Sequence, residues 1–132
     1  MKTLYHCSFE LSYHFVFVTK YRRKVLTGEM LTSLEQIVRN LCERWGCNLA
    51  EFNGEPDHVH LLLELNPRIA PSVAANNLKT VSSRLLRKEF GAQLAAAYKG
   101  NVLWSRSYFV ATCGGAPLEA IKRYIQKQNR PS

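Results

Sequence analysis

Two histidines that stand two residues apart, His58 and His60, are the side chains of this sequence best suited to hold a metal ion. The stretch 56–65 around them reads as a β-strand, in which successive side chains point to opposite faces. Both imidazoles therefore lie on one face, although an ordinary pair of half-buried histidines would have the same pattern. The opposite face is purely apolar and consists of Val59, Leu61, Leu63 and Leu65.

A second group of candidate residues lies near the C-terminus, where Ala116-Pro117 starts a predicted helix that runs to about Asn129. Tyr124 and Gln128 border the buried face of this helix and, four residues apart, stand one above the other. If the helix packs on the sheet face that bears His58 and His60, a phenol, a carboxamide and two imidazoles converge. Such a set could provide three neutral metal ligands and one nucleophile.

Tyr124 is the nucleophile of this set. A tyrosine has a pKa of about 10, so at neutral pH it attacks only an electrophile that is already activated. A divalent cation held by two imidazoles and an amide oxygen keeps nearly its full charge and has positions open for phosphate oxygens. Attack on a phosphodiester would give a phosphotyrosine, which conserves the bond energy for later rejoining.

The elements that must position these residues follow the order strand, helix, strand, strand, helix, strand, helix. Strands are predicted at 10–20, 47–54, 56–65 and 102–113, and helices at 27–45, 72–90 and 116–129, with 91–101 as a loop that holds at most a helical turn. This order predicts an α+β fold: a ferredoxin-like, RRM-like antiparallel sheet with helices on one face and an extra C-terminal helix that carries the tyrosine. Residues 1–132 suit a single domain.

The charge of the chain favours a polyanionic partner, with nucleic acid as the first candidate. Eighteen Lys and Arg against ten Asp and Glu give a net charge of +8. A basic cluster, Lys20-Tyr21-Arg22-Arg23-Lys24, follows the first strand, and Lys79 and Arg87 lie opposite the predicted core face of helix 72–90 (Ala74, Leu78, Val81, Leu85). Both cationic groups could equally be solvated surface.

Neither a membrane nor a disulfide framework is expected. No apolar run approaches the roughly 20 residues needed to cross a bilayer, and the first residues lack a signal-peptide core, so we expect a cytoplasmic protein. The four scattered cysteines suit reduced thiols. The spacing of Cys42 and Cys47 from the histidines matches no common zinc finger, and we interpret these two as small buried hydrophobes.

Taken together, the chain resembles the single-tyrosine HUH transposases of bacterial insertion sequences, which act on single-stranded DNA. The similarity spans nearly the whole chain in the order of the family. It is carried by Pro56 to Leu63, Thr19-Lys20-Tyr21-Arg22-Arg23, Leu78-Lys79-Thr80-Val81-Ser82-Ser83-Arg84, Leu103-Trp104-Ser105-Arg106-Ser107-Tyr108 and Tyr124-Ile125-Gln126-Lys127-Gln128.

The resemblance implies a role for each candidate residue. His58 and His60 would bind Mg²⁺ or Mn²⁺, Gln128 would be the third ligand, and Tyr124 would attack the scissile phosphate to leave a 5′-phosphotyrosine and a free 3′-OH. It also implies an obligate homodimer that binds hairpins near the element ends, with active sites shared between subunits. The candidate DNA-binding residues are Lys20, Arg22, Arg23, Lys79, Arg84 and Arg87.

Three alternatives stay open at this point. The chain could be a domesticated relative that cleaves repeated palindromes elsewhere in its genome. It could be a non-catalytic RRM-like module that binds single strands through Tyr108, Phe109 and the basic residues. A metal-dependent phosphohydrolase that uses water would need carboxylate ligands, of which Asp57 and Glu64 lie close in sequence, and alternation sends Asp57 to the wrong face.

Overall fold

The computed structural model describes residues 12–113 together with Arg123 and Gln126. Within them lies a four-stranded antiparallel sheet with the strand order β2-β3-β1-β4. This order confirms the predicted ferredoxin-like sheet and places β1 and β3 at its centre. The elements are β1 (Ser12–Thr19), the 3₁₀ turn η1 (Lys20–Arg22), α2 (Gly28–Trp45), β2 (Asn48–Glu55), β3 (His58–Glu64), α3 (Pro71–Glu89), α4 (Gly91–Ala97) and β4 (Trp104–Thr112).

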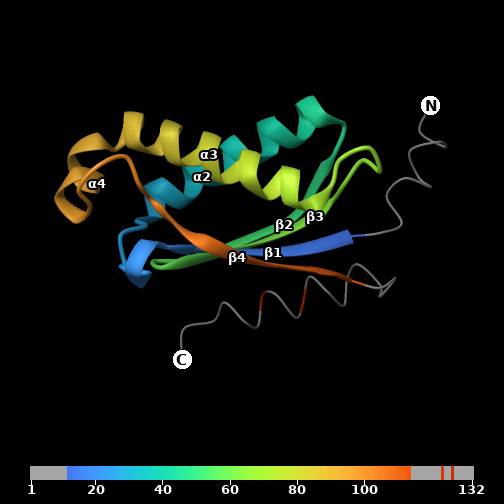
Figure 1. The fold of residues 1–132 in the computed structure, drawn as a ribbon, viewed down its shortest axis with the longest axis horizontal. Coiled ribbons are helices and arrows are strands. Elements are labelled where there is room, and N and C mark those ends of the chain that lie inside the picture. The colour runs from blue at the N-terminus through green and yellow to red at the C-terminus, as the bar shows by residue number, and fades with distance from the viewer. Residues whose placement is uncertain (1–11, 114–122, 124–125, 127–132) are drawn as a thin grey trace.

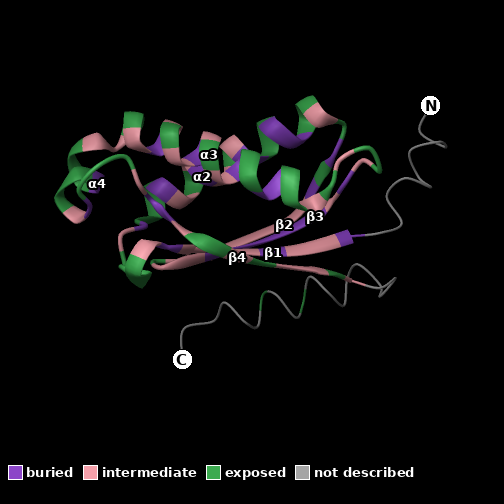
Figure 2. Cartoon of the chain, viewed as in Figure 1, coloured by how far each residue is buried: buried purple, intermediate pink, exposed green. Residues whose placement is uncertain are grey.

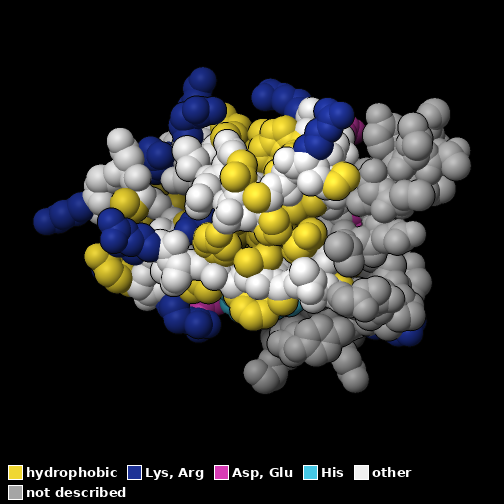
Figure 3. All heavy atoms as spheres, turned by 45° about the vertical axis from the view of Figure 1, so that its right-hand side comes forward, with side chains coloured by type: hydrophobic (Ala, Val, Ile, Leu, Met, Phe, Trp, Pro, Cys, Tyr) yellow, Lys and Arg dark blue, Asp and Glu magenta, His cyan; other side chains and the backbone are white. Residues whose placement is uncertain are grey.

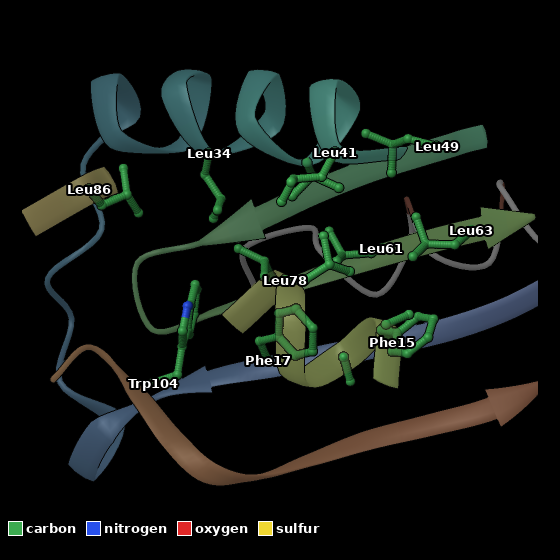
Figure 4. Close-up of a cluster of buried hydrophobic side chains, with 14 of the residues drawn as sticks. Phe15, Phe17, Leu34, Leu41, Leu49, Leu61, Leu63, Leu78, Leu86 and Trp104 are labelled. Carbon is green, nitrogen blue, oxygen red and sulfur yellow. The ribbon is translucent and has the colours of Figure 1, made fainter. Parts of the chain in front are cut away.

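Helices α2 and α3 lie side by side on one face of the sheet (Figure 1). The strand register pairs Phe15 with Leu61 and Phe17 with Val59, so these residues share the helix-covered face. All four are at most 2% exposed, and the core they form fills the space between the sheet and the two helices (Figures 2 and 4). The predicted alternation of β3 is therefore confirmed: Val59 and Leu61 lie in this core, whereas Leu62 is buried on the opposite face of the sheet.

Helix α2 has the ends that its sequence predicts. The Thr27 hydroxyl accepts a hydrogen bond from the backbone N–H of Met30 at 3.2 Å, which caps the first turn. Gly46 ends the helix in the left-handed conformation, with φ 68°, where a side chain would be strained.

The predicted core face of helix α3 is only partly right. Ala74 and Leu78 are buried as expected, whereas Val81 and Leu85 lie at the border. Ser82 is buried instead, and its hydroxyl accepts a hydrogen bond from the indole Nε1 of Trp104 at 3.0 Å. The buried stripe of α3 also includes Ala75 and Leu86.

Two further predictions meet different outcomes. The segment predicted as a loop with at most a helical turn forms α4, a helix of seven residues whose Leu94 reaches the core. Cys42 and Cys47 are buried thiols in the core, as predicted. Burial raises the pKa of the Cys42 thiol to about 12. The nearby Cys47 adds to this rise, and the charge of Arg39 opposes it.

The predicted tyrosine helix, 116–129, lies outside the described residues apart from Arg123 and Gln126, which are exposed and have helical backbone conformation. Within the described part of the chain, no helix combines the length and the apolar character that a membrane crossing requires.

Candidate functional site

The candidate site lies on the face of the sheet opposite the helices. His60 pairs with Val16 on β1 and with Asn53 on β2, so its side chain shares this face with theirs. His58 lies two residues earlier on the same face, and the two imidazole rings meet edge to face with centroids 5.2 Å apart. The prediction that the two histidines point the same way is confirmed.

Asp57 binds one of these histidines directly. Its Oδ1 lies 2.8 Å from Nδ1 of His58, and its Oδ2 lies 3.6 Å from the guanidinium of Arg22. Burial raises the pKa of Asp57, but the His58 hydrogen bond and the charges of His58 and Arg22 outweigh it, and the net pKa is below the ordinary value. The expectation that Asp57 faces the wrong way is wrong, because the strand begins only at His58 and turn residues do not alternate.

His60 is bound by a third histidine, His14, which comes from β1. Nε2 of His14 lies 2.8 Å from Nδ1 of His60, and the ring planes are within 18° of parallel. Burial of His60, together with the neighbouring His14 and His58, lowers its pKa to about 4, and burial also lowers the pKa of His14. Both shifts favour the neutral ring, the form in which imidazole binds metals.

Each histidine of the pair thus has one ring nitrogen in a hydrogen bond and a second ring nitrogen available to bind a metal ion. Nδ1 of His58 is bonded to Asp57 and Nδ1 of His60 to His14, so Nε2 is the remaining nitrogen of both rings. Within residues 12–113 and at 123 and 126, no three His, Cys, Asp or Glu side chains are grouped so that they could hold a metal ion. A complete metal site therefore needs a ligand of another type or from beyond these residues.

Tyr124 and Gln128 lie outside the described residues. Gln126, which stands between them in the sequence, donates a hydrogen bond from Nε2 to Oε2 of Glu51 at 3.1 Å. Glu51 pairs with Leu62 on β3 and so projects from the same face as His60. The one polar contact described for the C-terminal segment is thus made with the histidine face of the sheet.

The basic cluster after β1 forms a sharp turn beside this site. Tyr21 and Arg22 both have left-handed backbone angles, with φ 60° and 53°, and the Tyr21 side chain is 71% exposed. Arg22 reaches Asp57, whereas Arg23 donates to the carbonyl of Ala97 and lies over the rings of Tyr21 and Tyr98. Of the predicted DNA-binding residues, Arg22 is therefore the one that contacts a partner of the histidine pair.

The other predicted DNA-binding residues lie along α3, on the helix side of the sheet. Nζ of Lys79 donates to the carbonyls of Ser105 and Arg106 at 2.6 and 2.9 Å, and burial lowers its pKa. Arg84 and Arg87 line a surface pocket of about 310 Å³ between α3 and α4. Figure 3 shows one side of the molecule, with Lys and Arg side chains along its upper and left margins.

Tyr108 and Phe109 cannot form the single stacking surface considered for an RRM-like module. Tyr108 pairs with Phe17 on the helix side, where their rings meet edge to face. Phe109 points to the histidine face, is 53% exposed, and packs its ring against the ring of His14 at 5.8 Å.

Sequence reasoning missed His14 and Asp57. His14 was recoverable, because the predicted sheet order places β1 beside the histidine strand, and His14 alternates to the face opposite Phe15. Finding its partner required the strand register, which sets His14 opposite Leu62 and diagonal to His60. Asp57 required the exact start of the strand, which alternation alone does not give.

Comparison with known proteins points to one group. A family model described as "Transposase IS200 like" matches residues 7–128. The chain is 36% identical over 127 residues to the transposase for insertion sequence element IS200 of Salmonella typhimurium, covering 96% of this chain and 82% of that protein. It is 33% identical to the ISDra2 transposase TnpA of Deinococcus radiodurans, covering 92% and 86%.

Solved structures agree with these sequence similarities. A crystal structure described as a candidate transposase from Deinococcus radiodurans R1 superposes with a TM-score of 0.71 at 32% identity, covering 91% of this chain and 92% of that one. A REP-associated tyrosine transposase bound to a REP hairpin gives a TM-score of 0.59, covering 86% of this chain and 61% of that one. At 12% identity this second likeness concerns the fold alone.

Proposed function

The chain belongs to the IS200-like transposase family, and from this membership we propose that it cleaves and rejoins single-stranded DNA at the ends of an insertion sequence. Tyr124 attacks the scissile phosphate, so that a bond forms between its phenol oxygen and phosphorus while the bond to the 3′ oxygen breaks. The 5′ end then stays on Tyr124, and the departing strand carries a free 3′-hydroxyl that takes up the proton. The observation that carries the proposal is the histidine pair on the sheet face opposite the helices.

The donor set fits a divalent cation, Mg²⁺ or Mn²⁺. His58 and His60 offer their Nε2 atoms, since both Nδ1 atoms are engaged, and the Gln128 carboxamide is the proposed third ligand. Three neutral ligands leave the charge of such a cation intact, so that when bound it neutralises the phosphate oxygens and stabilises the departing oxygen.

Gln126 places the C-terminal segment beside the histidine face. Its hydrogen bond to Glu51 is made on the histidine face. Tyr124 and Gln128 are each two residues away from Gln126 in the sequence. Helix residues two apart do not share a face, so this contact places the segment and not these two side chains. In the proposed active state, this segment instead crosses to the partner in a homodimer, so that each subunit contributes its tyrosine to the histidine pair of the other.

Single-stranded DNA with hairpin ends is the proposed substrate. The net charge of +8 favours a phosphate backbone. Arg22 lies next to Asp57 and could contact phosphates near the site. The exposed ring of Phe109, beside His14, offers a surface on which an unpaired base could stack.

The test is incubation of the protein with labelled single-stranded DNA from an insertion-sequence end in the presence of Mg²⁺. We expect a protein–DNA adduct that survives SDS and is absent when a chelator replaces the cation. Tyr124→Phe deletes one oxygen, so it should abolish the adduct while DNA binding in a gel-shift assay stays.

Tyr13→Phe is the matched control, since Tyr13 points to the helix side of the sheet, opposite Leu63, and it should form the adduct normally. An adduct that persists in Tyr124→Phe would rule out the tyrosine assignment. Binding without any cleavage by the wild type would favour the non-catalytic module, and cleavage without an adduct would favour a hydrolase that uses water.

A further inference from the structure

We propose that His14 is a positioning residue, which holds the ring proton of His60 on Nδ1 so that Nε2 is free to bind the cation. This inference rests on the metal site of the proposed function and deepens it. It assigns a task to a residue of β1 that lies 46 positions from His60 in the sequence.

The contact between the two rings is a hydrogen bond, so one ring must donate a proton and the other must accept it. The nitrogens are 2.8 Å apart, while the ring centroids are 5.0 Å apart in planes 18° from parallel, so the rings approach each other through their nitrogen edges. A neutral imidazole has one N–H and one lone pair. Either His14 donates to His60, or His60 donates to His14.

The two arrangements have opposite consequences for a metal ligand. If His14 donates, Nδ1 of His60 accepts, its proton must sit on Nε2, and neither nitrogen has a lone pair left. If His60 donates from Nδ1, His14 accepts through Nε2 and the lone pair of His60 Nε2 is free. A site that binds a cation through His60 therefore requires His14 as the acceptor.

His58 offers a comparison within the same site. Its Nδ1 faces a carboxylate oxygen of Asp57 at 2.8 Å, and an ionised carboxylate only accepts. The proton of His58 is therefore fixed on Nδ1. His14 does for His60 what Asp57 does for His58, and Phe109 on one side of its ring keeps that ring in place.

The experiment begins without any metal. A long-range ¹H–¹⁵N spectrum of the histidine side chains reports which nitrogen carries the proton. In the wild type, we expect the Nδ1–H form at both His58 and His60. In His14→Phe, which keeps a ring and removes the acceptor, His60 should shift toward the Nε2–H form while His58, held by Asp57, stays unchanged. His14→Gln, whose carboxamide oxygen can accept, should restore the Nδ1–H form.

The second readout is Mn²⁺ affinity by calorimetry. We expect His14→Phe to weaken binding about 10- to 100-fold, with His14→Gln recovering most of the loss. Val16→Ala, which removes bulk directly opposite His60 without touching a hydrogen bond, is the matched control and should bind within about twofold of the wild type.

The inference is overturned if His60 of the wild type carries its proton on Nε2, if His14→Phe leaves the His60 spectrum unchanged, or if it binds Mn²⁺ as tightly as the wild type. The wild-type spectrum decides even if His14→Phe does not fold. Failure of the proposed function looks different, because wild-type protein that binds no Mn²⁺ would refute the metal site while the spectrum still reports the His14 hydrogen bond.

Discussion

The two histidines of the pair are supported by partners of different chemistry. His58 is oriented by a carboxylate, and His60 by a neutral imidazole that is itself held within a sheet. Each support comes from outside the His-Val-His sequence, one from the preceding turn and one from another strand. Removing both rings of the pair therefore tests the site without removing its supports.

We predict that the variant His58→Ala/His60→Ala loses both DNA cleavage and Mn²⁺ binding, while its fold is kept. Val59, Leu61 and Leu63 of β3 face the helices and remain in the core, so stability should fall by about 1–3 kcal/mol, mainly from the lost hydrogen bonds. Calorimetry with Mn²⁺ and thermal unfolding followed by circular dichroism check both parts. Unchanged Mn²⁺ binding would mean that the metal site lies elsewhere.

The residues that sequence alone could identify are those for which a local pattern suffices. Alternation was enough to put His58 and His60 on one face. It was not enough for Asp57, whose turn conformation breaks the alternation, or for the His14–His60 pair, which depends on how β1 and β3 align. Long-range register is a tertiary property, and a local pattern contains no information about it.

Among the elements, α3 and β4 are joined by polar side chains, of which Lys79 was predicted to lie opposite the core face. Ser82 and Trp104 form a buried hydrogen bond, and Lys79 donates to two backbone carbonyls of β4. The spacing of apolar residues does not predict which polar side chains are buried in hydrogen-bonded pairs. For that reason the helix was predicted correctly and its buried face only in part.

Lys79 should therefore matter more for stability than an exposed cation of the same helix. Lys79→Met keeps the aliphatic stem but removes hydrogen bonds to Ser105 and Arg106, and we expect a loss of about 1–2 kcal/mol in the free energy of unfolding, measured with urea. Arg84→Met, on the same helix but exposed, should change it by less than about 0.5 kcal/mol. Equal effects in the two variants would contradict an anchoring role for Lys79.

For the whole molecule, the described part contains the histidine pair with its supports, and Gln126 contacts the same face. If the tyrosine acts on the histidine pair of a second subunit, a mixture of two inactive proteins should recover activity. We expect partial cleavage when Tyr124→Phe subunits are mixed with His58→Ala/His60→Ala subunits, because one site of the mixed dimer has both unmutated halves.

The measurement is formation of the SDS-stable adduct after subunit exchange, which tagged subunits can verify by co-purification. Each parent protein alone is the control and should form no adduct. If exchange is demonstrated and no activity returns, each site is built from a single chain.

The pairing of β1 with β3 also makes the histidine site depend on the native register of these two strands. Side chains alternate with a period of two, so a slip of one residue between these strands would turn His14 away from the histidine face and into the helix layer. The His14–His60 bond spans 46 residues, with α2 and β2 between the two strands in the sequence, so it requires β1 and β3 to be paired in the correct register. A chain with misaligned strands would thus lack the hydrogen bond that supports His60, and its histidine site would be incomplete.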